Sequence, residues 1–141
     1  MVKKSMEQKP LQKRGAHFFE QKDHLSCGLA ATNSILSMYG KKPKEHWDTK
    51  DGSSTKMIMN RLRKNGIKSE GKTITSDKIK PKSIAYYPKK EDHYVTIEKV
   101  SGDKLYINDS SKKSPSWVNM KDFEKKWIDK NNTGYVIETS L

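Results

Sequence analysis

Residues 21–40 read QKDHLSCGLAATNSILSMYG, and this stretch predicts a buried helix that begins at a reactive thiol. From Cys27 to Tyr39 the apolar side chains recur at helical spacing and cover much of the circumference, so we expect the helix to be buried. Ser26 is placed to cap its start, and Gly40 is placed to end it in a left-handed turn.

Cys27, the only cysteine in the chain, has two interpretations. A lone cysteine is usually a small buried hydrophobic residue. At a helix N-terminus, however, the helix dipole and the free backbone amides stabilise a thiolate, which is the nucleophilic form. Gly28 follows and would let a substrate backbone approach closely, which makes it a weaker candidate for substrate binding. We therefore predict that Cys27 is a catalytic nucleophile.

The rest of the chain predicts helices first and an antiparallel sheet second. Further helices are expected at 54–64 and 119–127, and strands at 83–87, 94–100, 104–109 and 134–139. The helix at 54–64 has an apolar stripe of Met57, Ile58 and Leu62, and Trp117 is expected to pack on the core. This order is typical of the α+β class, with N-terminal helices packed on a C-terminal antiparallel sheet.

His93 and Asp109 are expected to share one face of that sheet. If residues 101–103 form the loop between the two middle strands, Asp109 lies opposite Val95 and is a diagonal neighbour of His93. A loop with an even number of residues would place them on different faces. Side chains of diagonal neighbours can meet, so we predict that Asp109 orients His93 and that His93 serves as the catalytic base.

Gln21 lies six residues before Cys27. An ordinary polar loop residue would look the same. In a cysteine hydrolase, a side-chain amide just upstream of the nucleophile can donate to the developing oxyanion, with the Cys27 backbone amide as the second donor. We predict this role for Gln21.

Length and composition set further limits. The chain has 141 residues, which fits one domain, and we expect residues 1–16 to be a flexible basic arm before a single domain at 17–141. No apolar run is long enough to span a membrane, and no secretion signal is evident, so we expect a cytoplasmic monomer. His24 and Cys27 have a spacing that zinc can use, but no second ligand pair is evident, and no metal or cofactor is expected.

The formal net charge of +12 has three interpretations. It can reflect a nucleic-acid binder, a lysine-rich surface that keeps the protein soluble, or a positive field that attracts an acidic peptide. Lysines are spread along the whole chain, only three arginines are present, and basic residues do not interleave with aromatic ones. No specific nucleic-acid partner is therefore expected.

The residues together resemble a known family over about 17–139: the bacterial cysteine peptidases that remove bacteriocin and peptide-pheromone leaders after a double glycine. The segment from Gln21 to Ala31 is similar to the family's glutamine-to-cysteine motif, including its spacing. His93 followed by Tyr94, and Asp109 sixteen residues after the histidine, are similar to its later motifs. Phe123 and Trp127 also resemble its closing Phe-and-Trp motif, whereas Ser110 stands where the family usually has proline.

The resemblance implies a papain-like fold and cleavage of a leader after Gly-Gly or Gly-Ala by thiolate acyl transfer. It implies a peptide substrate with an amphipathic, acidic leader and Tyr94 as a weaker candidate for substrate binding. The family's peptidase domain usually precedes a transporter, whereas here a free-standing enzyme with a separate ABC exporter is expected. Three alternatives stay open: a substrate-binding module without turnover, another papain-like acyl transfer such as deamidation or isopeptide cleavage, and nonspecific nucleic-acid binding.

Overall fold

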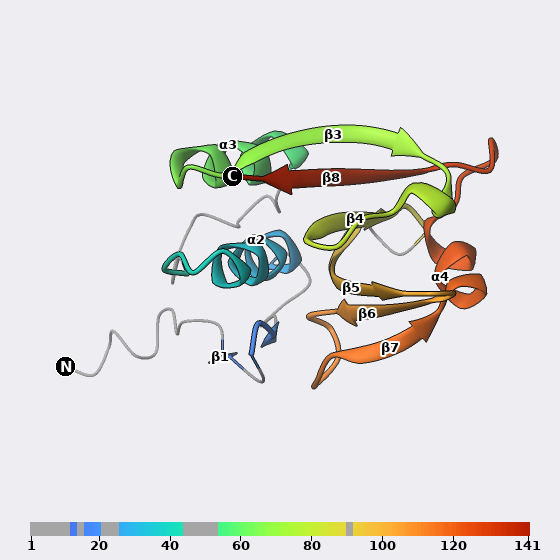
Figure 1. Cartoon of the computed structure of the whole chain (residues 1–141), viewed down its shortest axis with the longest axis horizontal. Coiled ribbons are helices and arrows are strands. Elements are labelled where there is room, and N and C mark those ends of the chain that lie inside the picture. Colours follow the sequence, from blue (N-terminus) through green and yellow to red (C-terminus); the bar gives the residue numbers. More distant parts are fainter. Residues whose placement is uncertain (1–11, 14–15, 21–25, 44–53, 90–91) are drawn as a thin grey trace.

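The computed structural model describes residues 12–13, 16–20, 26–43, 54–89 and 92–141 (Figure 1). The elements, in chain order, are β1 (Gln12–Lys13), β2 (Phe19–Glu20), α2 (Cys27–Met38), α3 (Thr55–Lys64), β3 (Lys68–Ile74), the short 3-10 helix η1 (Ser76–Lys78), β4 (Ser83–Tyr87), β5 (His93–Ser101), β6 (Lys104–Asn108), β7 (Ser116–Asn119), α4 (Met120–Trp127) and β8 (Gly134–Ser140). Six strands form one antiparallel sheet in the order β3-β8-β4-β5-β6-β7. The predicted α+β class is confirmed.

Both faces of the sheet are buried, each against different helices. Ile84 pairs with Ile137 across β4 and β8, and these two side chains lie in a core shared with α2 and α3. The next pair, Ala85 and Val136, lies in a second core shared with α4. Because successive side chains of a strand point to opposite faces, the sheet separates the two cores. In Figure 1, α2 and α3 lie together on one side, and α4 lies near the ends of β6 and β7.

The helix ends follow the sequence pattern closely. Gly40 follows α2 with φ of 71°, and Gly66 follows α3 with φ of 79°. In each case the residue after the glycine donates its amide to the carbonyl five residues earlier, which is a Schellman motif. Lys41 donates to Leu36 after α2, and Ile67 donates to Leu62 after α3. Ser54 caps α3, since its hydroxyl accepts a hydrogen bond from the Met57 amide at 3.1 Å.

Three local expectations are wrong. Ser26 holds the N-cap position of α2, but within the described chain its side chain makes no capping hydrogen bond to this helix. Ile58 and Leu62 are fully buried, whereas Met57 is exposed and does not belong to the buried stripe of α3. Trp117 is 49% exposed on the edge strand β7, where its ring packs beside Tyr106 and not in a core.

The strands β1, β2, β3 and β7 were not expected. Residues 68–74 read KSEGKTI, which lacks the apolar alternation of a half-buried strand, and most of their side chains are exposed. β3 is an edge strand that pairs with β8 along seven residues, so the pairing is made mainly by backbone groups. β7 is the opposite edge and is only four residues long.

The loop between β5 and β6 is shorter than expected. Residues 101–103 were predicted as the loop, but Ser101 pairs with Lys104, so only residues 102–103 connect the strands. Gly102 has φ of 59°, the positive value that two-residue hairpin loops require at this position. A loop with an even number of residues would by itself put Asp109 and His93 on different faces of the sheet.

A β-bulge in β5 restores the expected faces. The register between β5 and β6 shifts by one residue just after Ile97. Beyond the bulge Thr96 pairs with Asn108, which is the register that a three-residue loop would have produced. Because a bulge adds one residue to one strand, it reverses the change of face made by the shorter loop. Asp109 therefore returns to the side of His93.

The N-terminal segment contributes a small strand pair. Residues 12–13 pair with residues 19–20 in an antiparallel arrangement, so part of the predicted arm contacts the domain that follows it. The boundary at residue 16 stays a prediction. Among the described residues, no helix is long and apolar enough to cross a membrane.

Candidate active site

Cys27 is placed at the N-terminus of a buried helix. It is the first residue of α2, and every residue of this helix up to Leu36 is buried. The Cys27 side chain is itself only 5% exposed, and its Sγ lies 3.9 Å from the backbone carbonyl oxygen of Asp92. Within α2, Ala30 donates its amide to the Ser26 carbonyl at 3.0 Å. The amides of residues 27–29 precede this first helical hydrogen bond, so Cys27 lies at the positive end of the helix dipole.

His93 and Asp109 meet at the end of the neighbouring strands. His93 is the first residue of β5, and Asp109 directly follows β6. His93 Nε2 lies 2.6 Å from Asp109 Oδ1, and both side chains are almost fully buried. Because Asp109 takes Nε2, the other ring nitrogen, Nδ1, stays available to a second partner. The contact that the sequence predicted between the two residues is therefore present, although it arises through a bulge.

Two acidic neighbours, Asp109 and Cys27, favour the imidazolium form of His93. Burial of the ring favours the neutral form, but hydrogen bonds to Asp109 and Cys27 and the charges of both groups outweigh burial and raise the pKa of His93 to about 9. Burial also favours a protonated Asp109, but hydrogen bonds from His93 and Ser111 and the His93 charge lower the pKa of this carboxyl well below its usual range. At neutral pH the pair is thus an imidazolium and a carboxylate.

The Asp109 carboxylate is held by a turn of its own chain. Oδ1 accepts hydrogen bonds from the Ser111 amide at 3.0 Å and the Ser111 hydroxyl at 2.7 Å. The Asp109 carbonyl accepts a third bond, from the Lys112 amide at 2.9 Å. This Asx-turn orients the carboxylate toward His93, and Ser110, which stands where the related family usually has proline, is buried within it.

Replacing Ser111 with alanine is expected to weaken this support without removing it. The hydroxyl is lost, but the Ser111 amide still donates to Asp109, so we expect kcat/KM to fall about two- to five-fold. The measurement is peptide cleavage by the purified variant. Ser114→Ala, an exposed serine in the same loop, serves as the control and should leave the rate unchanged. A rate equal to that of the unmodified protein would contradict the role assigned to the turn.

Two tyrosines flank the catalytic candidates. The rings of Tyr87 and His93 lie 6.1 Å apart, and burial together with the Asp109 charge raises the pKa of Tyr87. Tyr94 is buried in the same core as Cys27, and burial, followed by the nearby charged groups, raises its pKa also. Both phenols therefore stay neutral at physiological pH.

The remaining predicted site residues fall into two groups. Gln21 lies outside the described residues, as does His24. Gly28 is the second residue of α2 and is buried, and Tyr94 is 6% exposed, so their predicted contact with substrate stays a prediction. In the described part of the chain, no three His, Cys, Asp or Glu side chains gather in a way that could hold a metal ion.

Sequence reasoning missed Ser111, Asp92 and the exact partners of Asp109. Ser111 had a signal, since an Asp followed by two serines favours an Asx-turn that holds its own carboxylate. Asp92 had none beyond its position next to His93, because its contact with Cys27 joins residues 65 apart in the chain.

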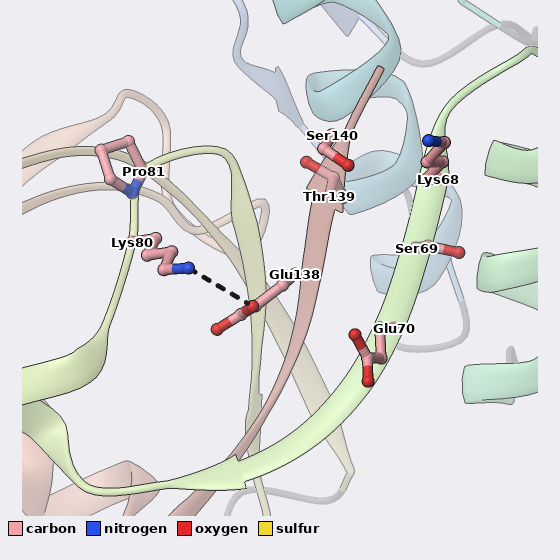
Figure 2. Close-up of a pocket in the computed structure, with 8 residues that line it drawn as sticks. All are labelled: Lys68, Ser69, Glu70, Lys80, Pro81, Glu138, Thr139 and Ser140. Carbon is pink, nitrogen blue, oxygen red and sulfur yellow. Dashed lines mark ion pairs between the residues drawn. The ribbon is translucent and has the colours of Figure 1, made fainter.

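A separate pocket lies far from these residues. A cavity of about 430 Å³ is lined by Lys68, Ser69, Glu70, Lys80, Pro81, Glu138, Thr139 and Ser140, as Figure 2 shows. It borders the end of β8, where Thr139 hydrogen-bonds Tyr39 at the C-terminal end of α2. Cys27 is at the other end of this helix. Two of the lining charges pair with each other, since Lys80 lies 3.9 Å from Glu138, and Glu138 also binds Lys72, which is outside the lining, at 2.9 Å.

Comparison with solved structures places the fold. The double-glycine-motif protease of an AMS/PCAT transporter, solved with its leader peptide, has a TM-score of 0.68 and 20% identity, and the match covers 93% of this chain and 96% of that one. The peptidase domain of Streptococcus ComA, a bifunctional ABC transporter of a quorum-sensing pathway, has a TM-score of 0.68 and 18% identity over 86% of this chain and 95% of that one. A peptidase C39-like domain of a toxin secretion ATP-binding protein from Vibrio parahaemolyticus has a TM-score of 0.61 and 13% identity over 85% and 98%.

These likenesses confirm the papain-like peptidase fold that the sequence predicted. A search of curated proteins finds no match. The family model described as the Peptidase C39 family matches residues 16–139, which include Cys27, His93 and Asp109. The chain belongs to the Peptidase C39 family.

Proposed function

We propose that this protein is a cysteine peptidase in which Cys27 is the nucleophile, His93 the general acid and base, and Asp109 the group that orients His93. One observation carries the proposal: His93 Nε2 lies 2.6 Å from Asp109 Oδ1, and Cys27 Sγ lies 3.9 Å from the carbonyl oxygen of Asp92, the residue before His93. Residues from α2, β5 and the end of β6 thus converge from distant parts of the chain. A buried cysteine kept only for packing would not need an imidazolium and a carboxylate beside it.

The reaction starts from the thiolate and imidazolium pair. The Cys27 sulfur attacks the scissile carbonyl carbon and forms a C–S bond, and the carbonyl π electrons move to the oxygen. As the tetrahedral intermediate collapses, the C–N bond breaks and His93 gives its proton to the leaving amine. Neutral His93 then takes a proton from water, and the hydroxide attacks the thioester carbon. The C–S bond breaks, which releases the acid product and restores the thiolate beside the imidazolium. Asp109 keeps the ring in one orientation throughout.

The oxyanion needs donors close to the sulfur. The Cys27 backbone amide is at the start of α2, where the helix dipole favours negative charge. Gln21 is proposed as the second donor on the basis of its spacing before Cys27. Two donors of this kind stabilise the developing charge before any structural adjustment is needed.

The proposed substrate is a peptide with a leader that ends in a double-glycine site. Membership of the Peptidase C39 family supports this, as does the likeness to a double-glycine-motif protease that was solved with a leader peptide. The net charge of +12 would attract a leader with acidic residues. We also propose a peptide-exporting ABC transporter as a partner and the cytoplasm as the place of reaction, where a lone nucleophilic thiol stays reduced.

The substrate class is tested with a defined precursor. We expect the purified protein to cut a peptide with an acidic amphipathic leader directly after Gly-Gly, because two residues without side chains fit a narrow cleft. Mass spectrometry of the products locates the bond. A matched precursor with Val-Val at the same place should stay intact. Cleavage at another site would contradict the proposed specificity, and tight binding of an intact Gly-Gly precursor would favour a binding module instead.

A further inference from the structure

The residue directly before His93 has an unusual backbone. Asp92 has φ of 55°, in the left-handed region that residues with a side chain rarely adopt. Aspartate tolerates this region better than most residues, but an extended conformation is still favoured unless the surroundings hold it. Since Asp92 is exposed, burial does not provide that hold.

The Tyr86 side chain supplies it. The Tyr86 hydroxyl donates a hydrogen bond to Asp92 Oδ1. Tyr86 is on β4 and pairs directly with Tyr94 on β5, and their rings lie 5.4 Å apart at an angle of 46°. The Tyr86 backbone is therefore held by the sheet, and its ring is held by packing against the Tyr94 ring. The hydrogen bond to Asp92, then partial burial and the Asp92 charge, raise the pKa of Tyr86 to about 12, so the hydroxyl keeps its proton as the donor.

The consequence reaches the nucleophile. The Asp92 carbonyl oxygen is the group 3.9 Å from Cys27 Sγ, so the direction of this carbonyl sets one wall of the space that the sulfur occupies. The same backbone conformation sets the angle at which the chain enters β5, whose first residue is His93. A change in the Asp92 backbone would therefore move the sulfur contact and the imidazole together.

We propose that Tyr86 and Asp92 are a positioning pair for the active site: the hydroxyl holds the carboxylate, and this keeps Asp92 in the conformation that aligns His93 with Cys27. Neither residue touches the reacting atoms through its side chain. The assignment rests on the proposed cysteine peptidase function. The pair acts through the backbone conformation of Asp92 and not through the charge of its carboxylate.

Conservative substitutions separate geometry from charge. Tyr86→Phe keeps the ring against Tyr94 but removes the donor. Asp92→Ala removes the acceptor and tolerates the positive φ less well. Asp92→Asn removes the charge but keeps an oxygen for the Tyr86 hydroxyl and tolerates the positive φ equally well. Tyr39→Phe is the matched control, because its hydroxyl bonds Thr139 at the opposite end of α2.

The experiment measures two rates on each folded variant, with melting temperature as the check on folding. The first is kcat and KM for the Gly-Gly precursor. The second is alkylation of the single thiol by iodoacetamide at neutral pH, which needs no substrate. We expect Tyr86→Phe and Asp92→Ala to lower kcat about ten-fold with little change in KM, and to slow alkylation several-fold. Asp92→Asn should lose about two-fold or less, and Tyr39→Phe should match the unmodified protein.

The double variant Tyr86→Phe with Asp92→Ala should lose no more than Asp92→Ala alone, because the two residues act as one unit. Unchanged kcat in Tyr86→Phe, additive losses in the double variant, or an Asp92→Asn loss as large as that of Asp92→Ala would each overturn the proposal. If the unmodified protein cuts no precursor, the proposed substrate fails, while the alkylation rates still decide whether the pair positions the thiol.

Discussion

Replacing Cys27 with alanine is expected to abolish peptide cleavage. The sulfur is the atom proposed to form the acyl-enzyme, so its loss removes this covalent route and leaves only binding and oxyanion stabilisation. Removing the nucleophile of such a unit lowers kcat on the order of 10⁴-fold or more. The measurement is release of the mature peptide from the Gly-Gly precursor, followed by mass spectrometry.

The same variant gives a clean chemical control. Cys27 is the only cysteine of the chain, so one added mass after alkylation reports this side chain alone, and the alanine variant should gain none. Cys27→Ser retains a hydroxyl of similar size at the helix start and should also be inactive, which separates loss of the thiol from loss of packing. Cleavage that persists in a well-folded Cys27→Ala protein would rule out the mechanism and point to another nucleophile.

The helices could be predicted from sequence because their signals are local. Helical spacing after Cys27 and the glycines at 40 and 66 fix where α2 and α3 lie and how they end. The edge strand β3 could not be predicted, since its polar residues owe their conformation to backbone pairing with β8, whose paired residues lie 60 to 72 positions later in the chain. Strand pairing at this separation leaves no pattern within the strand itself.

The site shows the same division. Cys27 could be placed at a helix start from the local pattern, and the contact between His93 and Asp109 could be predicted from the alternation of their strands. The strand register between His93 and Asp109 could not be predicted. The short loop and the β-bulge each move Asp109 to the other face of the sheet, and the two changes cancel. Asp92 and its contact with the sulfur depend on a positive φ that nothing in the local sequence demands.

Replacing Asp109 with alanine is expected to have the second largest effect. The variant loses the acceptor that holds His93 Nε2, and the Ser111 amide and hydroxyl lose their shared partner. The imidazole can then adopt the wrong tautomer or turn away from Cys27. We expect kcat to fall about 10²- to 10³-fold at the optimal pH, as measured with the Gly-Gly precursor.

Asp109→Asn separates orientation from charge. The amide oxygen can take the place of Oδ1, accept from Ser111 and still orient the ring, as the asparagine of papain-like Cys-His-Asn sites does. We therefore expect its kcat at the optimal pH to stay within about ten-fold of the unmodified protein, well above that of the alanine variant. Equal activity of the two variants would show that Asp109 acts through its charge alone.

The pH profile of both variants should change in one direction. Burial opposes the imidazolium, and the bonds to Asp109 and Cys27 outweigh it, so the pKa of His93 is about 9 and the ring keeps the proton that the leaving amine needs. Activity of the unmodified protein should therefore persist through neutral pH and fall as the pH rises through about 9. Both variants lose the Asp109 charge, and the alanine variant also loses the hydrogen bond, so burial is opposed less strongly and this alkaline limb must move down toward the ordinary value of 6.5. The shift is measured by determining kcat/KM of each protein from about pH 5 to about pH 10. An alkaline limb that stays in place or moves to higher pH would show that Asp109 does not act on His93.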